Sequence, residues 1–171
     1  MRRYPFAIWL GIVCSVALSA SALYWGPERV ILGSGAINVT AGTLRAEYRQ
    51  AQERLTLPVG HGWPELPLPS VDPDDGTPYT YAPGVGAEWA EWYWFDMWAS
   101  VAASQTASAS LHKTAVGTLP AFYETTAFQS TAEAGYFREI ISKAGRGDLG
   151  PLREYVATVQ ALDSYGGGSS E

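Results

Sequence analysis

One cysteine and no run of lysine or arginine are the first features that limit what this sequence can do. With Cys14 alone, a disulfide framework, a multi-cysteine zinc site and an iron–sulfur cluster are excluded. The formal net charge is −6, and no basic cluster exists that could bind a nucleic acid. No internal repeat of solenoid or propeller length is present. The 171 residues therefore predict about one domain with no nucleic-acid partner.

Motifs for a metal, a cofactor or a nucleophile are also missing. Neither His61 nor His112 has a second histidine at helical spacing, so no metalloprotease motif is present. Segment 33–35 lacks the third glycine of a dinucleotide site. Segment 72–76 lacks the calcium-ligand spacing of an EF-hand and is instead typical of a turn. The sequence thus predicts no metal and no cofactor, and it favours, without deciding, a protein that is not an enzyme.

The N-terminus carries the pattern of an export signal. Arg2 and Arg3 precede an almost uncharged stretch, residues 4–25, which matches a basic region followed by an apolar region. Small residues at 18–22 permit cleavage after Ala22. The stretch also reaches the ~20 residues that span a bilayer, so a retained membrane helix is the alternative. A lipoprotein on Cys14 is a third interpretation, which the bulky Val13 before it disfavours.

The cleaved signal and the retained helix both place the rest of the chain outside the cytoplasmic membrane, because the two arginines stay on the cytoplasmic side. The part after residue 25 then has nine basic and seventeen acidic residues, a net charge of −8. We expect residues 1–25 to be a signal peptide or signal-anchor helix, 26–42 a tether, 43–163 a helical domain and 164–171 a flexible tail.

The periodicity of apolar residues predicts an all-α domain, a small bundle of four or five helices. Thr43 is expected to cap the first helix, and His112 to lie near the C-terminal end of the longest one, where it would interact with the helix dipole. The expected helices cover residues 43–55, 87–113, 119–128, 130–144 and 151–162.

A proline-rich loop interrupts the helices at residues 58–83. It contains seven prolines, and each one removes a backbone donor and fixes φ, so neither a regular helix nor a central strand can form there. Large apolar side chains within the segment indicate that it wraps the helical body. We expect Trp63 to be its main anchor on the aromatic helix.

The aromatic helix is the most unusual feature of the chain. Four consecutive aromatic residues at 92–95 make the helix apolar on every side, and such a helix is buried or lies against a second surface. The first interpretation is therefore a central core helix. The second is an aromatic platform for a sugar, a partner helix or a membrane surface. The aromatic candidates for binding are Trp63, Trp89, Trp92, Trp94 and Trp98.

Three acidic residues on the same helix are the candidates for catalysis. Asp96 is flanked by apolar residues and could be desolvated, which is how a carboxyl group is tuned for proton transfer. Glu88 and Glu91 lie one turn apart, and paired carboxylates beside aromatic rings are what a glycoside hydrolase uses. The alternative is that all three have ordinary structural roles, with Asp96 exposed to solvent or bonded to a Tyr or Trp donor.

The segments 55–64 (LTLPVGHGWP) and 81–86 (YAPGVG), followed by the Trp-rich helix, resemble those of small exported actinobacterial proteins of unknown function. The resemblance implies export and a unit of proline-rich loop plus helix, and it brings no activity. We therefore expect a non-enzymatic cell-envelope protein, a helical interaction module or accessory subunit beside a membrane or envelope partner. The alternative is a protein that binds or hydrolyses cell-wall carbohydrate.

Overall fold

The computed structural model describes residues 39–66, 71, 74 and 76–166, with side chains described as far as residue 161. The described part is mostly helical, with six α-helices and one two-stranded sheet, which confirms the predicted all-α class. The expected N-terminal helix and most of the tether lie outside the described residues. The elements are β1 (Val39–Thr40), α2 (Ala41–Arg54), β2 (Thr80–Tyr81), α3 (Val85–Ala103), α4 (Ala109–Thr118), the 3-10 helix η2 (Leu119–Glu124), α5 (Thr126–Ser130), α6 (Ala134–Gly145) and α7 (Gly150–Gly166).

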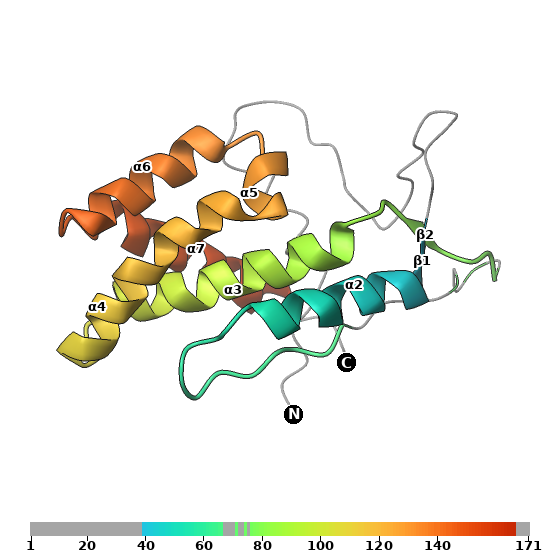
Figure 1. The fold of residues 1–171 in the computed structure, drawn as a ribbon, viewed down its shortest axis with the longest axis horizontal. Helices are drawn as coiled ribbons and strands as arrows, with labels where there is room; N and C mark the ends of the chain where they lie inside the picture. The colour runs from blue at the N-terminus through green and yellow to red at the C-terminus, as the bar shows by residue number, and fades with distance from the viewer. Residues whose placement is uncertain (1–38, 67–70, 72–73, 75, 167–171) are drawn as a thin grey trace.

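Helix α3 lies at the centre of the domain (Figure 1). Helix α2 packs along one side of it, and α4, α5, η2 and α7 contact its other sides. An apolar helix with no single hydrophilic face is stable only when neighbours cover it all round. This arrangement places α3 between two apolar clusters and confirms the interpretation of the aromatic helix as a core helix.

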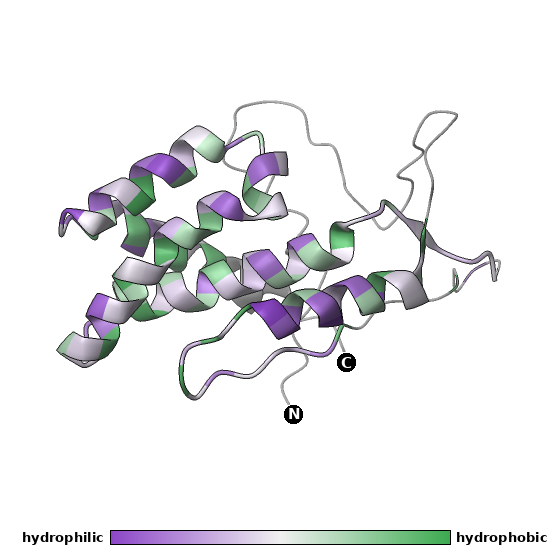
Figure 2. Ribbon diagram, in the orientation of Figure 1, coloured by the Kyte–Doolittle hydropathy of each residue, from purple (hydrophilic) through white to green (hydrophobic). Residues whose placement is uncertain are grey.

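The larger cluster joins α3 to the C-terminal helices and is built from aromatic rings. The Phe95 ring stacks on Phe122 of η2 with centroids 4.3 Å apart, and Phe137 of α6 meets Phe95 edge-on at 5.6 Å. Helix α6 carries both hydrophilic and hydrophobic residues (Figure 2), and its buried face comprises Phe137, Ile140, Ile141 and Ala144. These four residues repeat at helical spacing and therefore form one stripe along the helix.

The smaller cluster joins α2 to the first turns of α3. Leu44, Tyr48 and Ala51 repeat at helical spacing and are buried. The helix, however, begins at Ala41, and its cap is Thr40 rather than Thr43: the Thr40 hydroxyl accepts from the backbone N–H of Thr43 at 3.3 Å. A threonine before the first turn satisfies an otherwise unpaired N–H group, and Thr40 stands in that position.

The predicted helix over 87–113 is wrong in one respect, because the chain leaves the helix at Ser104. The Ser104 hydroxyl accepts from the Thr106 N–H, and the Ser108 hydroxyl caps α4 by accepting from the Leu111 N–H. Serine and threonine side chains compete in this way with backbone helical bonds. His112 therefore lies in the N-terminal half of α4, and the predicted interaction with a helix C-terminus does not occur.

Three other boundaries also differ from the expectations. The segment expected as one short helix is η2 followed by α5, with the Thr125 hydroxyl capping α5. Part of the expected tether is structured, because β1 pairs antiparallel with β2. Helix α7 continues to Gly166, into the segment expected to be a flexible tail. The Thr125 cap and the pairing of β1 with β2 set the first two of these boundaries, and the periodicity of apolar residues contains neither.

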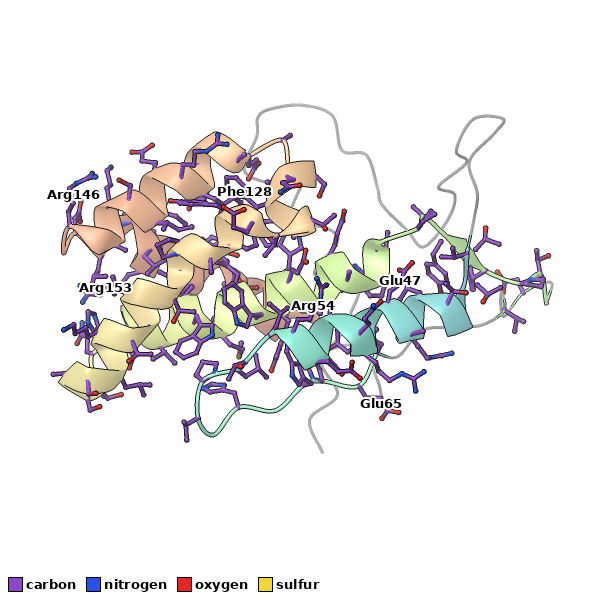
Figure 3. All side chains as sticks on the ribbon, in the orientation of Figure 1. Glu47, Arg54, Glu65, Phe128, Arg146 and Arg153 are labelled. Atoms are coloured by element: carbon purple, nitrogen blue, oxygen red, sulfur yellow. The ribbon has the colours of Figure 1, made fainter. Side chains whose placement is uncertain are left out.

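The start of α3 is fixed to α2 by one carboxylate and one glycine. Glu47 lies between the two helices (Figure 3), and its two oxygens accept from the backbone N–H groups of Gly84 and Gly86 at 3.1 and 3.2 Å. A Cβ atom on Gly86 would lie only 2.2 Å from the Leu44 carbonyl oxygen. The two backbones can approach this closely only because residue 86 is glycine.

Gly86→Ala is therefore expected to destabilise the protein by at least about 2 kcal/mol, because the clash is with backbone that cannot move aside. Urea unfolding followed by circular dichroism measures the change. Gly117→Ala is the matched control, since Gly117 is in helix α4 and has nothing within 4 Å of an added Cβ. It should be neutral or stabilise the protein by up to about 1 kcal/mol. Equal stability of the two variants would contradict the close packing of α2 on α3.

Candidate functional site

The tryptophans expected as candidate binding residues divide into two groups. Trp92, Trp94 and Trp98 are buried in the larger apolar cluster. Trp63 and Trp89 are partly buried and pack at the edges of the clusters. The first three are thus core residues, and the other two are only partly buried.

The indole N–H groups of α3 hold the chain that follows α2. Trp94 and Trp98 lie one turn apart, and both donate from Nε1 to the backbone carbonyl of Thr56, at 3.0 and 2.9 Å. A buried indole N–H needs an acceptor, because an unmade hydrogen bond in the interior costs about 1–3 kcal/mol. One carbonyl oxygen accepts from both indoles and fixes the beginning of the loop on the core.

Two tyrosine hydroxyls hold the other end of the same loop. Tyr93 donates to the carbonyl of Gly62 at 2.9 Å, and Tyr48 donates to the carbonyl of Pro64 at 3.1 Å. The ring of Trp63 lies between these two tyrosines, with centroids 6.0 Å from Tyr48 and 5.6 Å from Tyr93. We call residues 56–64, with these four donors, the clamped loop. The prediction that Trp63 anchors the loop on the aromatic helix is confirmed for this part of segment 58–83.

The clamped loop carries a tight turn at its tip. The His61 N–H donates to the Pro58 carbonyl at 3.1 Å, and Gly60 has a φ of +87°. That backbone conformation favours glycine, which has no Cβ to clash. Pro58 is fully buried, whereas the Val59 side chain is 91% exposed. The loop swings away from the helices after α2 and then returns along them (Figure 1).

Glu91 has a structural role at the start of α5. It is only 4% exposed, and its Oε2 accepts from the Ala127 N–H at 2.8 Å. Burial raises the pKa of the Glu91 carboxyl, while the Ala127 hydrogen bond and the positive charge of Arg54 oppose that rise. A carboxylate at a helix N-terminus satisfies free N–H groups there, so Glu91 anchors α5 to α3.

Glu88 lies one turn earlier and is half-buried. Burial raises its pKa, a hydrogen bond with the Ser130 side chain opposes the rise, and the nearby Glu91 adds to it. Ser130 is the last residue of α5. The two glutamates thus contact opposite ends of the same short helix.

Asp96 faces a different neighbour. It is 2% exposed, and its Oδ1 accepts from the Tyr155 hydroxyl of α7 at 2.5 Å. Burial and the adjacent Asp96 raise the pKa of Tyr155 well above its ordinary value, so the phenol stays protonated and donates. This is the structural alternative stated for Asp96, a hydrogen bond to a tyrosine donor.

The three candidate acids therefore do not form one open catalytic site. Glu88 and Glu91 face α5, and Asp96 faces α7. Asp96 lies five positions after Glu91, which places the two residues on different sides of a helix with 3.6 residues per turn. Each acid is held by a hydrogen bond that joins α3 to another helix.

Metal and membrane features are limited in the described part of the chain. No group of three or more His, Cys, Asp or Glu residues there could hold a metal ion. His61 is exposed on the clamped loop, and His112 is partly buried on α4. None of the helices in the described part has the length and hydropathy needed to cross a membrane.

Comparison with known proteins found no match to a family model, to a curated protein or to a solved structure.

Sequence reasoning missed the side chains that hold the loop. The spacing of apolar residues does not reveal that the Tyr48 and Tyr93 hydroxyls and the Thr56 carbonyl form hydrogen bonds with or within the loop. One signal was available: Trp94 and Trp98 lie four residues apart and therefore share a helix face. Two indole donors on one buried face require acceptors, and a proline-rich segment with few internal backbone bonds can supply carbonyls.

Trp63→Ala should lower the free energy of unfolding by about 2–4 kcal/mol, because it removes a large aromatic side chain that fills the space between the loop and both helices. Trp63→Phe keeps a ring there and should cost less than half as much. Thermal and urea unfolding measure both variants. If Trp63→Ala has the same melting temperature and urea midpoint as the wild type, the packing of the loop on the core is contradicted.

Glu91→Gln keeps an oxygen acceptor for the Ala127 N–H but cannot ionise. Because the folded-state pKa of Glu91 is raised, its contribution to stability is fully present below the unfolded value of about 4.3 and is lost as the pH rises through the folded value. Between about pH 4 and pH 7, the wild type should therefore lose stability relative to Glu91→Gln. Urea unfolding at both pH values measures this difference.

Glu139 supplies a control of opposite sign. It is an exposed partner of Lys143 at 2.8 Å, and the Lys143 hydrogen bond lowers the pKa of its carboxyl. Its contribution to stability is present above the unfolded pKa and is lost as the pH falls. From about pH 4 to pH 7, the wild type should therefore gain a little stability relative to Glu139→Gln. If the free energy of unfolding changes with pH in the same way for Glu91→Gln and for the wild type, the burial of an ionisable Glu91 is contradicted.

Proposed function

We propose that this chain is a non-enzymatic interaction module that acts on the outer side of the cytoplasmic membrane. The observation that carries the proposal is that α3 uses its unusual side chains internally. Trp94 and Trp98 bind the loop, Glu91 binds α5, and Asp96 binds Tyr155. These residues build a rigid helical body, and no shared cleft emerges from their geometry.

The location rests on the sequence. Arg2 and Arg3 precede an apolar run of the length and composition of an export signal or signal anchor. The resemblance to exported actinobacterial proteins agrees with this. The net charge of −8 after residue 25 favours a soluble domain that stays off an anionic surface and meets its partner through defined contacts.

The alternative is a module that binds cell-wall carbohydrate. One observation favours it: Trp63 and Trp89 are only partly buried, and aromatic faces are suited to sugar rings. In that case Trp63 would serve both as the loop anchor and as a binding surface, whereas Glu88 is the only one of the three acids that is partly exposed.

A pair of reporter fusions tests the location. Alkaline phosphatase fused after Glu171 should be active, and a fluorescent protein that folds only in the cytoplasm should be dark at the same position. Deletion of residues 1–25 is the control and should reverse both signals. Mass spectrometry of the mature N-terminus then separates the two forms, since Leu23 as first residue means cleavage and Met1 means an anchor. An inactive phosphatase on the full chain contradicts the proposed location.

Sedimentation with purified cell-wall polysaccharide separates the two functions. The interaction module should stay in the supernatant, as should Trp63→Phe. A carbohydrate-binding protein would sediment with the wall, and Trp63→Phe would change how much is retained. If more of the folded wild type than of the unfolded protein sediments with the polysaccharide, the carbohydrate-binding alternative is favoured.

A further inference from the structure

Helix α5 depends on its neighbours for its stability. It spans only Thr126–Ser130, and an isolated helix shorter than about 12–15 residues is marginal in water. The residues that flank it, Thr125 and Thr131, are both extended, with ψ angles of 155° and 135°. An extended residue at each end allows α5 to leave its place without unwinding another helix, and short elements of this kind open locally before the rest of a domain.

Two carboxyl groups of α3 hold the two ends of α5. The Glu91 carboxyl accepts from the Ala127 N–H at 2.8 Å, in the first turn of α5. The Glu88 carboxyl forms a hydrogen bond with the side chain of Ser130, the last residue of α5. Helix α5 has no ionisable side chain of its own. The charge at the contact between these two helices is therefore set by the protonation of the two glutamates.

The Ser130 hydroxyl connects the protonation of Glu88 to the last turn of α5. This hydroxyl also donates to the Ala127 carbonyl at 3.2 Å. A hydroxyl has one hydrogen to donate and two lone pairs with which to accept. A protonated Glu88 can donate to Ser130 and leave the bond to the Ala127 carbonyl in place. An ionised Glu88 can only accept, so it competes with that carbonyl for the single hydrogen.

Ionisation also places two negative charges one turn apart under α5. Burial is the main cause of the raised pKa of each carboxyl, and the charge of Glu91 adds to the rise at Glu88. Arg54 of α2 and two backbone N–H groups of α5 oppose the rise at Glu91. The other charged groups near α5 are Arg138 of α6, which lies 5.0 Å from the centroid of the aromatic ring of α5, and Glu124 of η2, which is exposed.

We propose that α5 is a proton-controlled flap, which is closed on α3 when Glu88 and Glu91 are protonated and opens when both are ionised. Opening lets water reach the two carboxylates. Because both folded-state pKa values are raised, the stabilisation of the closed flap is fully present below the unfolded value of about 4.3 and is lost as the pH rises through the folded values. The flap does not depend on the function proposed above.

The surface that the flap covers is apolar. Ala127 is fully buried, and Phe128 is only 4% exposed. The Phe128 ring packs on two rings of η2, with centroids 5.7 Å from Phe122 and 5.1 Å from Tyr123. Opening of α5 separates these rings. The flap thus makes the accessibility of an aromatic surface depend on the proton concentration around the protein.

Hydrogen exchange of the full chain from about pH 4.5 to pH 7.5, corrected for intrinsic exchange rates, tests the flap. The probes are the N–H groups of Ala127 and Phe128, which are bonded to Glu91 and to the Thr125 hydroxyl. Release of one proton on opening changes an opening constant by up to tenfold per pH unit. The opening constant of α5 should therefore rise at least about threefold over this range. At the upper pH it should exceed the constant measured at the buried face of α6.

The variant that carries both Glu88→Gln and Glu91→Gln cannot ionise at the contact, so its α5 opening constant should not change with pH. Glu124→Gln is the matched control, because it removes an exposed carboxyl close to α5, and it should keep the rise of the wild type. A rise that persists in the double variant would overturn the proposal. So would a wild type without the rise, or one in which α5 and α6 have equal opening constants at pH 7.5, since α5 would then open only with the whole domain. The wild-type profile decides by itself if the double variant does not fold.

Discussion

The need to satisfy two buried indole N–H groups connects the parts of this structure. Trp94 and Trp98 are placed in the core because α3 is apolar on every side, and their Nε1 atoms then require an acceptor. The Thr56 carbonyl is that acceptor, and it can serve because the chain has left the helix at Leu55. Burial of α3 therefore depends on fixation of the loop. Without the loop, the indole N–H groups of Trp94 and Trp98 would be buried with no acceptor.

The same logic accounts for the acidic residues of α3. Glu91 and Asp96 are buried, and each accepts from a donor on another helix, the Ala127 N–H or the Tyr155 hydroxyl. A carboxyl group in an apolar core is tolerated when a donor faces it. A desolvated acid beside aromatic rings can also be the sign of catalysis, and only the positions of the donors distinguish the two roles. Here the donors belong to the fold, so the burial of both carboxyl groups has a structural explanation.

Much of the fold could be predicted from the sequence, since the helical spacing of apolar residues predicted an all-α domain and located α2, α6 and α7 approximately. The break at Ser104 could not, because it depends on whether serine hydroxyls bond to their own backbone or point to solvent. The roles of Asp96 and Glu91 were equally hidden, as their partners lie 59 and 36 residues further along the chain. Trp63 was predictable as an anchor because it is the one tryptophan in a segment that cannot form its own regular structure.

Hydrogen exchange at the tryptophan side chains tests the central claim most directly. In a ¹⁵N-labelled sample, the indole N–H signals of Trp94 and Trp98 can be assigned by replacing each residue with phenylalanine. Both signals should exchange as slowly as the backbone amides of α3, because their donors are buried and bonded to Thr56. Exchange of either indole within the dead time of the experiment, while the α3 amides remain protected, would contradict the account.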